Sequence, residues 1–207
     1  MNEAGIRSTE NVFKRVLVLF GLYTLISNAA FLLGYYFLPE GFLRSSAWTA
    51  AGQAANRPGS FGEQFALTLL FNLGWQVGLI IVLNFNQVRG MPAAYLIPIS
   101  LAIPGGLIPG TNSFVASDLN QYAVREGLAL AYSVGGLETL GFILIIAATV
   151  PFGIYQYRSW WRLSNPTKLM NIRDIRLTRW ELLTLIAGVL LVIFGAYRET
   201  LMAFGML

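Results

Sequence analysis

Long apolar stretches separated by short polar segments run through this chain of 207 residues. An α-helix of about 20 residues crosses the ~30 Å hydrocarbon core of a bilayer, and each stretch approaches or exceeds that length. The pattern predicts an all-α, polytopic transmembrane helical bundle of about five spans, in one integral membrane domain covering residues 1–207. The expected spans are Val12–Leu38, Phe61–Asn84, Met91–Ile108, Gly127–Tyr157 and Glu181–Tyr197. The helix of the fourth stretch ends either near Pro151-Phe152-Gly153 or at Tyr155-Tyr157.

The third stretch differs from the others because prolines interrupt it, and glycines stand beside the last two. Each interior proline removes a backbone hydrogen bond and kinks or breaks a helix, and in lipid the freed carbonyls need protein or water partners. We therefore expect a broken or re-entrant segment enclosed by the other helices. Broken helices at this depth form binding sites in transporters, whereas a kinked packing element is the simpler interpretation. The prolines are Pro92, Pro98, Pro104 and Pro109.

The fourth stretch carries Glu138 near its middle. A carboxyl group at that depth is costly unless it is protonated, paired or hydrated, so it marks a functional or packing site. Asn72 and Gln76 lie four residues apart on one face of the second span and are the expected partners. Small residues recur one helical turn apart before Glu138 and offer a close approach to another helix. The glycines assigned to this intramembrane site are Gly135, Gly136 and Gly141, and the small-residue stripe is Gly127, Ala131 and Gly135.

Three roles for Glu138 stay open at this point. It locks helices together as a neutral, hydrogen-bonded carboxyl, it couples transport to a proton or cation, or it contacts a partner in a larger complex. Buried polar groups normally find partners, which favours the first role.

Composition removes most catalytic chemistry. The chain has no cysteine and no histidine, so it lacks thiolate nucleophiles, imidazole bases and the usual ligands of zinc and haem. Both aspartates, Asp118 and Asp174, lie in loops, and no phosphate-binding glycine loop precedes a helix. We expect a non-enzymatic protein without cofactor or metal.

The basic residues predict the topology. Five crossings place ten of the fourteen Lys and Arg residues on the side of the N-terminus and four on the other. The positive-inside rule then assigns a cytoplasmic N-terminus to a multi-pass protein of the cell (inner) membrane. A re-entrant third segment remains the alternative. Residues 158–180 combine cations with tryptophans, as juxtamembrane segments do, and contact the membrane surface or a partner. The residues concerned are Arg158, Trp160, Trp161, Arg162, Lys168, Arg173, Arg176 and Arg179.

The order of features from Phe65 to Thr149 resembles the SpoIIM-like family, the relatives of stage II sporulation protein M. That family combines an Asn-containing helix, Gly-rich membrane segments and a late helix with the motif His-Gly-x-x-Glu-x-x-Ala. Here Gly135-Gly136-Leu137-Glu138-Thr139-Leu140-Gly141 matches its Gly, Glu and small residue, and Asn72, Gly74 and Gly78 resemble the earlier helix. Val134 stands at the histidine position. The resemblance implies a multi-spanning, non-enzymatic scaffold that anchors other envelope proteins.

Taken together, these patterns predict an integral membrane scaffold or accessory subunit. Its partners are membrane lipids and other membrane proteins, in a hetero-complex or a homo-oligomer, and not nucleic acid. The alternative is a small permease, or the membrane subunit of a transport system, with Glu138 as its proton- or cation-coupling site.

Overall fold

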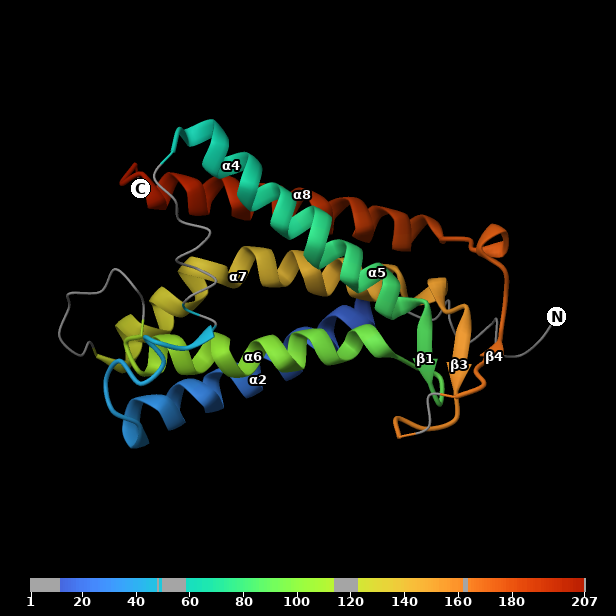
Figure 1. Ribbon diagram of the computed structural model, residues 1–207, viewed down its shortest axis with the longest axis horizontal. Helices are drawn as coiled ribbons and strands as arrows, with labels where there is room; N and C mark the ends of the chain where they lie inside the picture. Colours follow the sequence, from blue (N-terminus) through green and yellow to red (C-terminus); the bar gives the residue numbers. More distant parts are fainter. Residues whose placement is uncertain (1–11, 48, 50–58, 114–122, 162–163, 207) are drawn as a thin grey trace.

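The structure, a computed structural model, describes residues 12–47, 49, 59–113, 123–161 and 164–206. Long helices dominate it (Figure 1), which confirms the expected all-α bundle. They are α2 (Val12–Phe37), α4 (Phe61–Leu69), the π-helix η1 (Leu70–Val77), α5 (Gly78–Asn84), α6 (Leu96–Gly110), α7 (Val124–Ala148) and α8 (Arg179–Ala203). Among the described residues, four helical stretches are long and apolar enough to cross a membrane, and the bent α7 makes a fifth when counted as one span. These apolar helices indicate a multi-pass membrane protein.

Four short β-strands lie at one end of the bundle, which we call the sheet end (Figure 1). The opposite end, where α2 finishes and α4 begins, is the loop end. The strands are β1 (Asn86–Val88), β2 (Met91–Pro92), β3 (Tyr155–Tyr157) and β4 (Thr167–Lys168), in the order β2-β1-β3-β4. β1 pairs with β2 antiparallel and with β3 parallel, so it joins the segments that follow α5 and α7. The sequence did not predict this sheet, because strands of two or three residues carry no readable periodicity.

Short 3-10 helices adjoin the longer elements at the sheet end. They are η2 (Ala93–Tyr95), η3 (Val150–Phe152) and η4 (Ile172–Asp174).

Capping boxes begin α4 and α8. The hydroxyl of Ser60 accepts from the backbone N–H of Glu63, whose carboxylate accepts from the N–H of Ser60. Thr178 and Glu181 make the same reciprocal pair ahead of α8. Each box satisfies two backbone donors that a helix start leaves free, so both helices start where the sequence places Ser or Thr three residues before Glu.

The helices pack as two close pairs, α2 with α6 and α7 with α8. Gly106 of α6 lies against the backbone of α2, where a Cβ would overlap the carbonyl oxygen of Ser27. A Cβ on Gly141 of α7 would lie 2.7 Å from Cγ2 of Val192 in α8. Glycine at these two points lets helix backbones approach closely, as at membrane helix interfaces generally.

Several of the most buried apolar side chains come from the sheet-end half of α7. Ile143, Ile145 and Ile146 are fully buried there, together with Ile80 of α5 and Val192 of α8. This half of α7 is therefore the centre of the core, and the loop-end half is less enclosed.

The proline-rich stretch forms a continuous helix instead of the broken or re-entrant segment that we expected. Pro98 falls in the first turn of α6, where no intrahelical N–H bond is required, and Pro104 and Pro109 lie inside the helix. The stretch is not enclosed by the other helices either, since Ile103 is 49% exposed. α6 buries one face against α2 and leaves the other on the surface of the bundle.

The break that the prolines led us to expect occurs in α7 instead. This helix bends by 53° between its parts Val124–Ser133 and Gly135–Ala148. It also ends at Ala148, just ahead of the first of its two expected ends, near Pro151-Phe152-Gly153, because the chain continues through η3 into β3. The first two spans agree closely with the prediction, and α8 is longer than Glu181–Tyr197 at both ends.

Candidate functional site

Glu138 lies about one turn beyond the bend of α7. The bend follows from the local sequence, since Gly135 and Gly136 are adjacent and helices kink at such small-residue pairs. The bend changes the direction of the helix axis, so the side chains after the bend point in directions that they would not take in a straight helix. Glu138 is half-buried and faces other helices of the bundle.

Asn72 is the hydrogen-bond partner of Glu138. Its Nδ2 donates to Oε1 of Glu138 over 2.6 Å, and Nε2 of Gln76 donates to Oδ1 of Asn72 over 3.3 Å. The contact that we expected between these side chains is therefore present. Both amides lie in the π-helix η1, a form of helix found frequently at functional sites.

A polar stripe that sequence reasoning missed leads from the loop end toward Glu138. Gln64 and Thr68 are buried, and Nε2 of Gln64 donates to the Thr68 hydroxyl over 3.5 Å. They precede Asn72 and Gln76 at regular intervals of four residues, so one helix face carries four polar side chains. The spacing was readable in the sequence, where it extends the Asn72–Gln76 pair by two turns.

α8 closes the opposite side of the bend. Gly195 lies against Glu138, and a Cβ there would overlap Cγ of that side chain. The guanidinium of Arg198 donates to the carbonyl oxygen of Ser133, and its Nη2 donates to the Ser133 hydroxyl over 2.8 Å. Arg198 thus provides a donor to the backbone at the break, which a bent helix in lipid requires.

A cleft of about 270 Å³ lies beside Glu138. We call it the α6–α7 cleft, because most of its lining comes from those two helices. Glu138, Thr139 and Gln76 supply polar groups, and Tyr23 reaches it from α2. The cleft lies between helices of the two different pairs, α2 with α6 and α7 with α8. It brings together a carboxyl, an amide and hydroxyl groups at membrane depth.

No family model, curated protein or solved structure matches this chain. The resemblance to the SpoIIM-like family therefore stays a prediction. The two residues that carry most of it, Asn72 and Glu138, are nevertheless in direct contact in the structure.

The three predicted glycines have different surroundings. Gly135 lines the α6–α7 cleft, and no neighbouring atom lies within 4 Å of a Cβ placed there. A Cβ on Gly136 would contact only Tyr132 of the same helix. The expected stripe therefore receives no second helix at Gly135, and Gly136 contacts no other helix, whereas Gly141, further along α7, makes the close contact with α8.

The predicted membrane-surface residues gather on the segments at the sheet end, apart from Glu138 and its partners. Among the described residues of this set all side chains are exposed or half-buried, and Arg162 lies outside the described residues. Nε of Arg89 donates to the carbonyl of Arg158 over 3.1 Å, which ties this segment to the β1–β2 turn. The described members are Arg158, Trp160, Trp161, Lys168, Arg173, Arg176 and Arg179.

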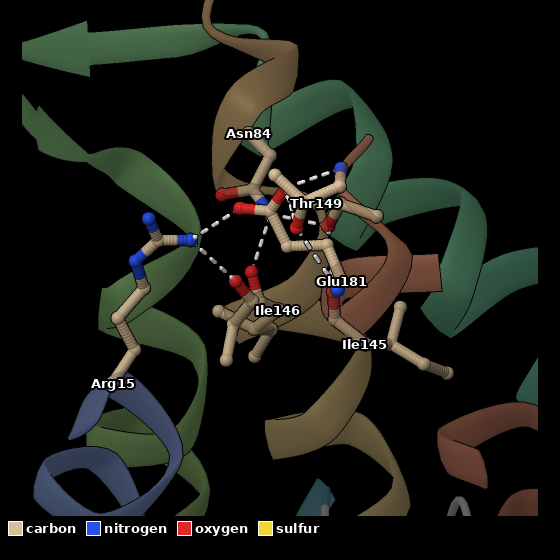
Figure 2. Close-up of polar contacts among 8 residues, drawn as sticks. Arg15, Asn84, Ile145, Ile146, Thr149 and Glu181 are labelled. Carbon is tan, nitrogen blue, oxygen red and sulfur yellow. Dashed lines mark hydrogen bonds and ion pairs between the residues drawn. The ribbon is translucent and has the colours of Figure 1, made fainter. Parts of the chain in front are cut away.

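A second polar cluster at the sheet end was also missed (Figure 2). Nη1 of Arg15 lies 3.1 Å from Oε1 of Glu181 and donates to the carbonyl of Ala147 over 3.1 Å. Nδ2 of Asn84 donates to the Thr149 hydroxyl over 2.6 Å. These contacts join α2, α5, α7 and α8. Two features of the sequence could have indicated this cluster. One is an arginine in the first turn of a span, and the other is a Thr-x-x-Glu capping box ahead of another span.

The chemistry available at Glu138 is hydrogen bonding and ion pairing. Within the described part of the chain, no group of three or more acidic, His or Cys side chains is placed to hold a metal ion. The carboxyl accepts from the amide of Asn72 and also lines a partly apolar cleft, so it serves either as an internal lock or as a ligand for a guest in the cleft.

Proposed function

We propose that this protein is a non-enzymatic membrane scaffold or accessory subunit, which holds a partner protein in the membrane. The polar groups at membrane depth support this role, because they are engaged between helices of the chain itself. Asn72 holds Glu138 and Arg198 holds Ser133, and such contacts fix the relative positions of helices. A bundle locked in this way offers a constant surface for assembly.

The outer face of the second span is the observation that carries the proposal. Phe71 and Trp75 stand out from it, the latter 67% exposed although it lies well inside the span. Beside them Gly74 is exposed, and no neighbour lies within 4 Å of a Cβ placed on Gly78. Small residues flanked by large ones are typical of faces on which another membrane helix packs. The partner that fits is a transmembrane helix of another protein.

The test is purification from native membranes in mild detergent. We expect the chain to elute with a partner in fixed stoichiometry, and we expect Gly78→Val to remove that partner. The matched control is Gly21→Val on α2, since a Cβ on Gly21 also meets no atom within 4 Å. Both variants should fold, so a difference between them reports docking. Elution of the wild-type chain alone, or equal behaviour of the two variants, would contradict the scaffold function.

The α6–α7 cleft favours a second candidate, a small permease or the membrane subunit of a transport system. Transporters form their sites at broken helices near mid-membrane, and Glu138 lies beside both a bend and a cleft. Glu138→Gln and Glu138→Leu distinguish the two functions. In a scaffold, Gln preserves assembly, whereas Leu costs about 1–3 kcal/mol because Asn72 loses its acceptor. In a proton-coupled transporter, Gln abolishes flux into liposomes and leaves the fold intact.

A further inference from the structure

The lining of the α6–α7 cleft is chemically mixed. Glu138 and Gln76 supply polar groups, and Leu101, Ile108 and Phe142 supply apolar surface. A guest that satisfies both kinds of lining carries a polar head and an apolar body.

We infer that this cleft binds a small organic cation, an ammonium group on a short apolar chain, with the Glu138 carboxylate as its counter-ion. This site goes beyond the scaffold function and does not depend on it. The ligand class is recognised by one ion pair and by apolar contact, with no covalent step.

The sign of the charge on the guest follows from the residues around the cleft. Among the described residues that line the cleft, Glu138 is the only one with a carboxyl group, and none is lysine or arginine. The guanidinium of Arg198 is held by the carbonyl and hydroxyl of Ser133 and is not part of the lining. A cation is therefore attracted and an anion repelled.

The geometry of the carboxyl also suits an ammonium ligand. Asn72 occupies Oε1 of Glu138, which orients the group and leaves Oε2 to receive N–H donors from the guest. Thr139 and Gln76, also in the lining, supply further oxygen acceptors for an ammonium with three donors. An isolated charge at this depth is costly, and pairing with a cation of opposite sign offsets that cost.

The apolar part of the guest has room because of Gly135. A Cβ at this position would meet no atom within 4 Å, so a larger side chain would project into the space that the guest requires. Each CH₂ group buried against Leu101 or Phe142 should improve affinity by about fourfold, from the ~0.8 kcal/mol per buried CH₂. Affinity should therefore rise with chain length until the 270 Å³ of the cleft is filled.

The experiment measures binding of n-alkylammonium ions from propyl to hexyl to the purified full chain in nanodiscs, at neutral pH, with empty nanodiscs subtracted. The n-alkanols and n-alkanoates of equal length are the comparison ligands. We expect the ammonium series to bind at least tenfold more tightly than the alkanols, and the alkanoates not to bind. Glu138→Gln should reduce ammonium affinity to that of the alkanol. Glu63→Gln, which alters an exposed carboxyl in the capping box of α4, is the matched control and should bind as the wild type does.

A second variant keeps the inference testable if Glu138→Gln folds poorly. Gly135→Leu retains the carboxyl and should abolish ammonium binding by filling the cleft. Equal affinities for ammonium ions and alkanols would show that the cleft takes only apolar guests such as acyl chains, and would overturn the inference. Absence of ammonium binding to the wild type, or unchanged binding to Gly135→Leu, would overturn it as well. None of these outcomes bears on partner co-purification, so the scaffold function stands or fails separately.

Discussion

Removal of the Arg15 guanidinium should destabilise the bundle more than any other charge change at the sheet end. Arg15→Met leaves the Glu181 carboxylate without its counter-ion, and the side chain of Glu181 is only 2% exposed. Arg15 itself is 12% exposed, so the solvent screens the pair weakly. The same change also removes the hydrogen bond to the carbonyl of Ala147 near the end of α7.

The magnitude follows from the geometry of the pair. Unit charges 3.1 Å apart attract by about 5 kcal/mol at an effective dielectric constant of about 20. Desolvation offsets part of this attraction, and loss of one partner of a buried pair typically costs about 3–5 kcal/mol. The start of α8 and the Thr178 cap still stabilise the remaining carboxylate, so we expect about 3 kcal/mol.

The assay is unfolding of the purified chain by SDS in mixed micelles, followed by circular dichroism. Lys14→Met is the matched control, because Lys14 is the exposed neighbour of Arg15, and its loss should change the free energy of unfolding by less than about 1 kcal/mol. The double variant Arg15→Met with Glu181→Gln leaves no charge buried and keeps the cap, so it should be more stable than Arg15→Met alone. A loss of under 1 kcal/mol for Arg15→Met, or additive losses in the double variant, would refute the reasoning.

Three further predictions concern topology and packing. A cysteine introduced at Ser164, at the sheet end, should resist a membrane-impermeant maleimide in intact cells. A cysteine introduced at Ser45, at the loop end, should react with it. The reverse result would mean that the predicted orientation in the membrane is wrong. Gly141→Ala should lower the free energy of unfolding by about 1–3 kcal/mol, because the added methyl group overpacks against α8. Gly21→Ala, where a Cβ has open space around it, should not lower the free energy of unfolding in the same SDS titration. A photoactivatable lipid should label the chain at Ile103, because that side chain is exposed on α6; absence of labelling there would mean that another protein covers this face.

The spans could be predicted from sequence because length and hydropathy alone determine which segments enter lipid. The second span begins and ends at Phe61 and Asn84 as predicted, since a serine cap and a polar turn bound it. The Asn72–Glu138 contact was also predictable, because a carboxyl at mid-membrane needs a donor and few lie at the same depth.

Other features depend on packing that the sequence does not encode locally. Prolines suggested a break in α6, yet Pro98 falls where a helix tolerates it, and α2 supports the rest of the helix through the close approach at Gly106. The bend falls in α7, where Arg198, 65 residues away, supplies the compensating donor. The α6–α7 cleft is lined by helices of two different pairs, which no single segment reveals.

The π-helix of the second span affects how this span contacts α7 at two separate points. Asn72 reaches Glu138 on one side of it, and Asn84 reaches Thr149 at its far end. The wider turns between Leu70 and Val77 adjust the phase of the helix so that both asparagines face the same neighbour. Ordinary α-helical turns over the same residues would rotate one half against the other by about 100°. One asparagine would then turn away from α7, although the hydropathy of the span would not change. Deletion of one residue together with this change of form would instead keep both asparagines in phase, so helical phase limits which insertions and deletions this site tolerates.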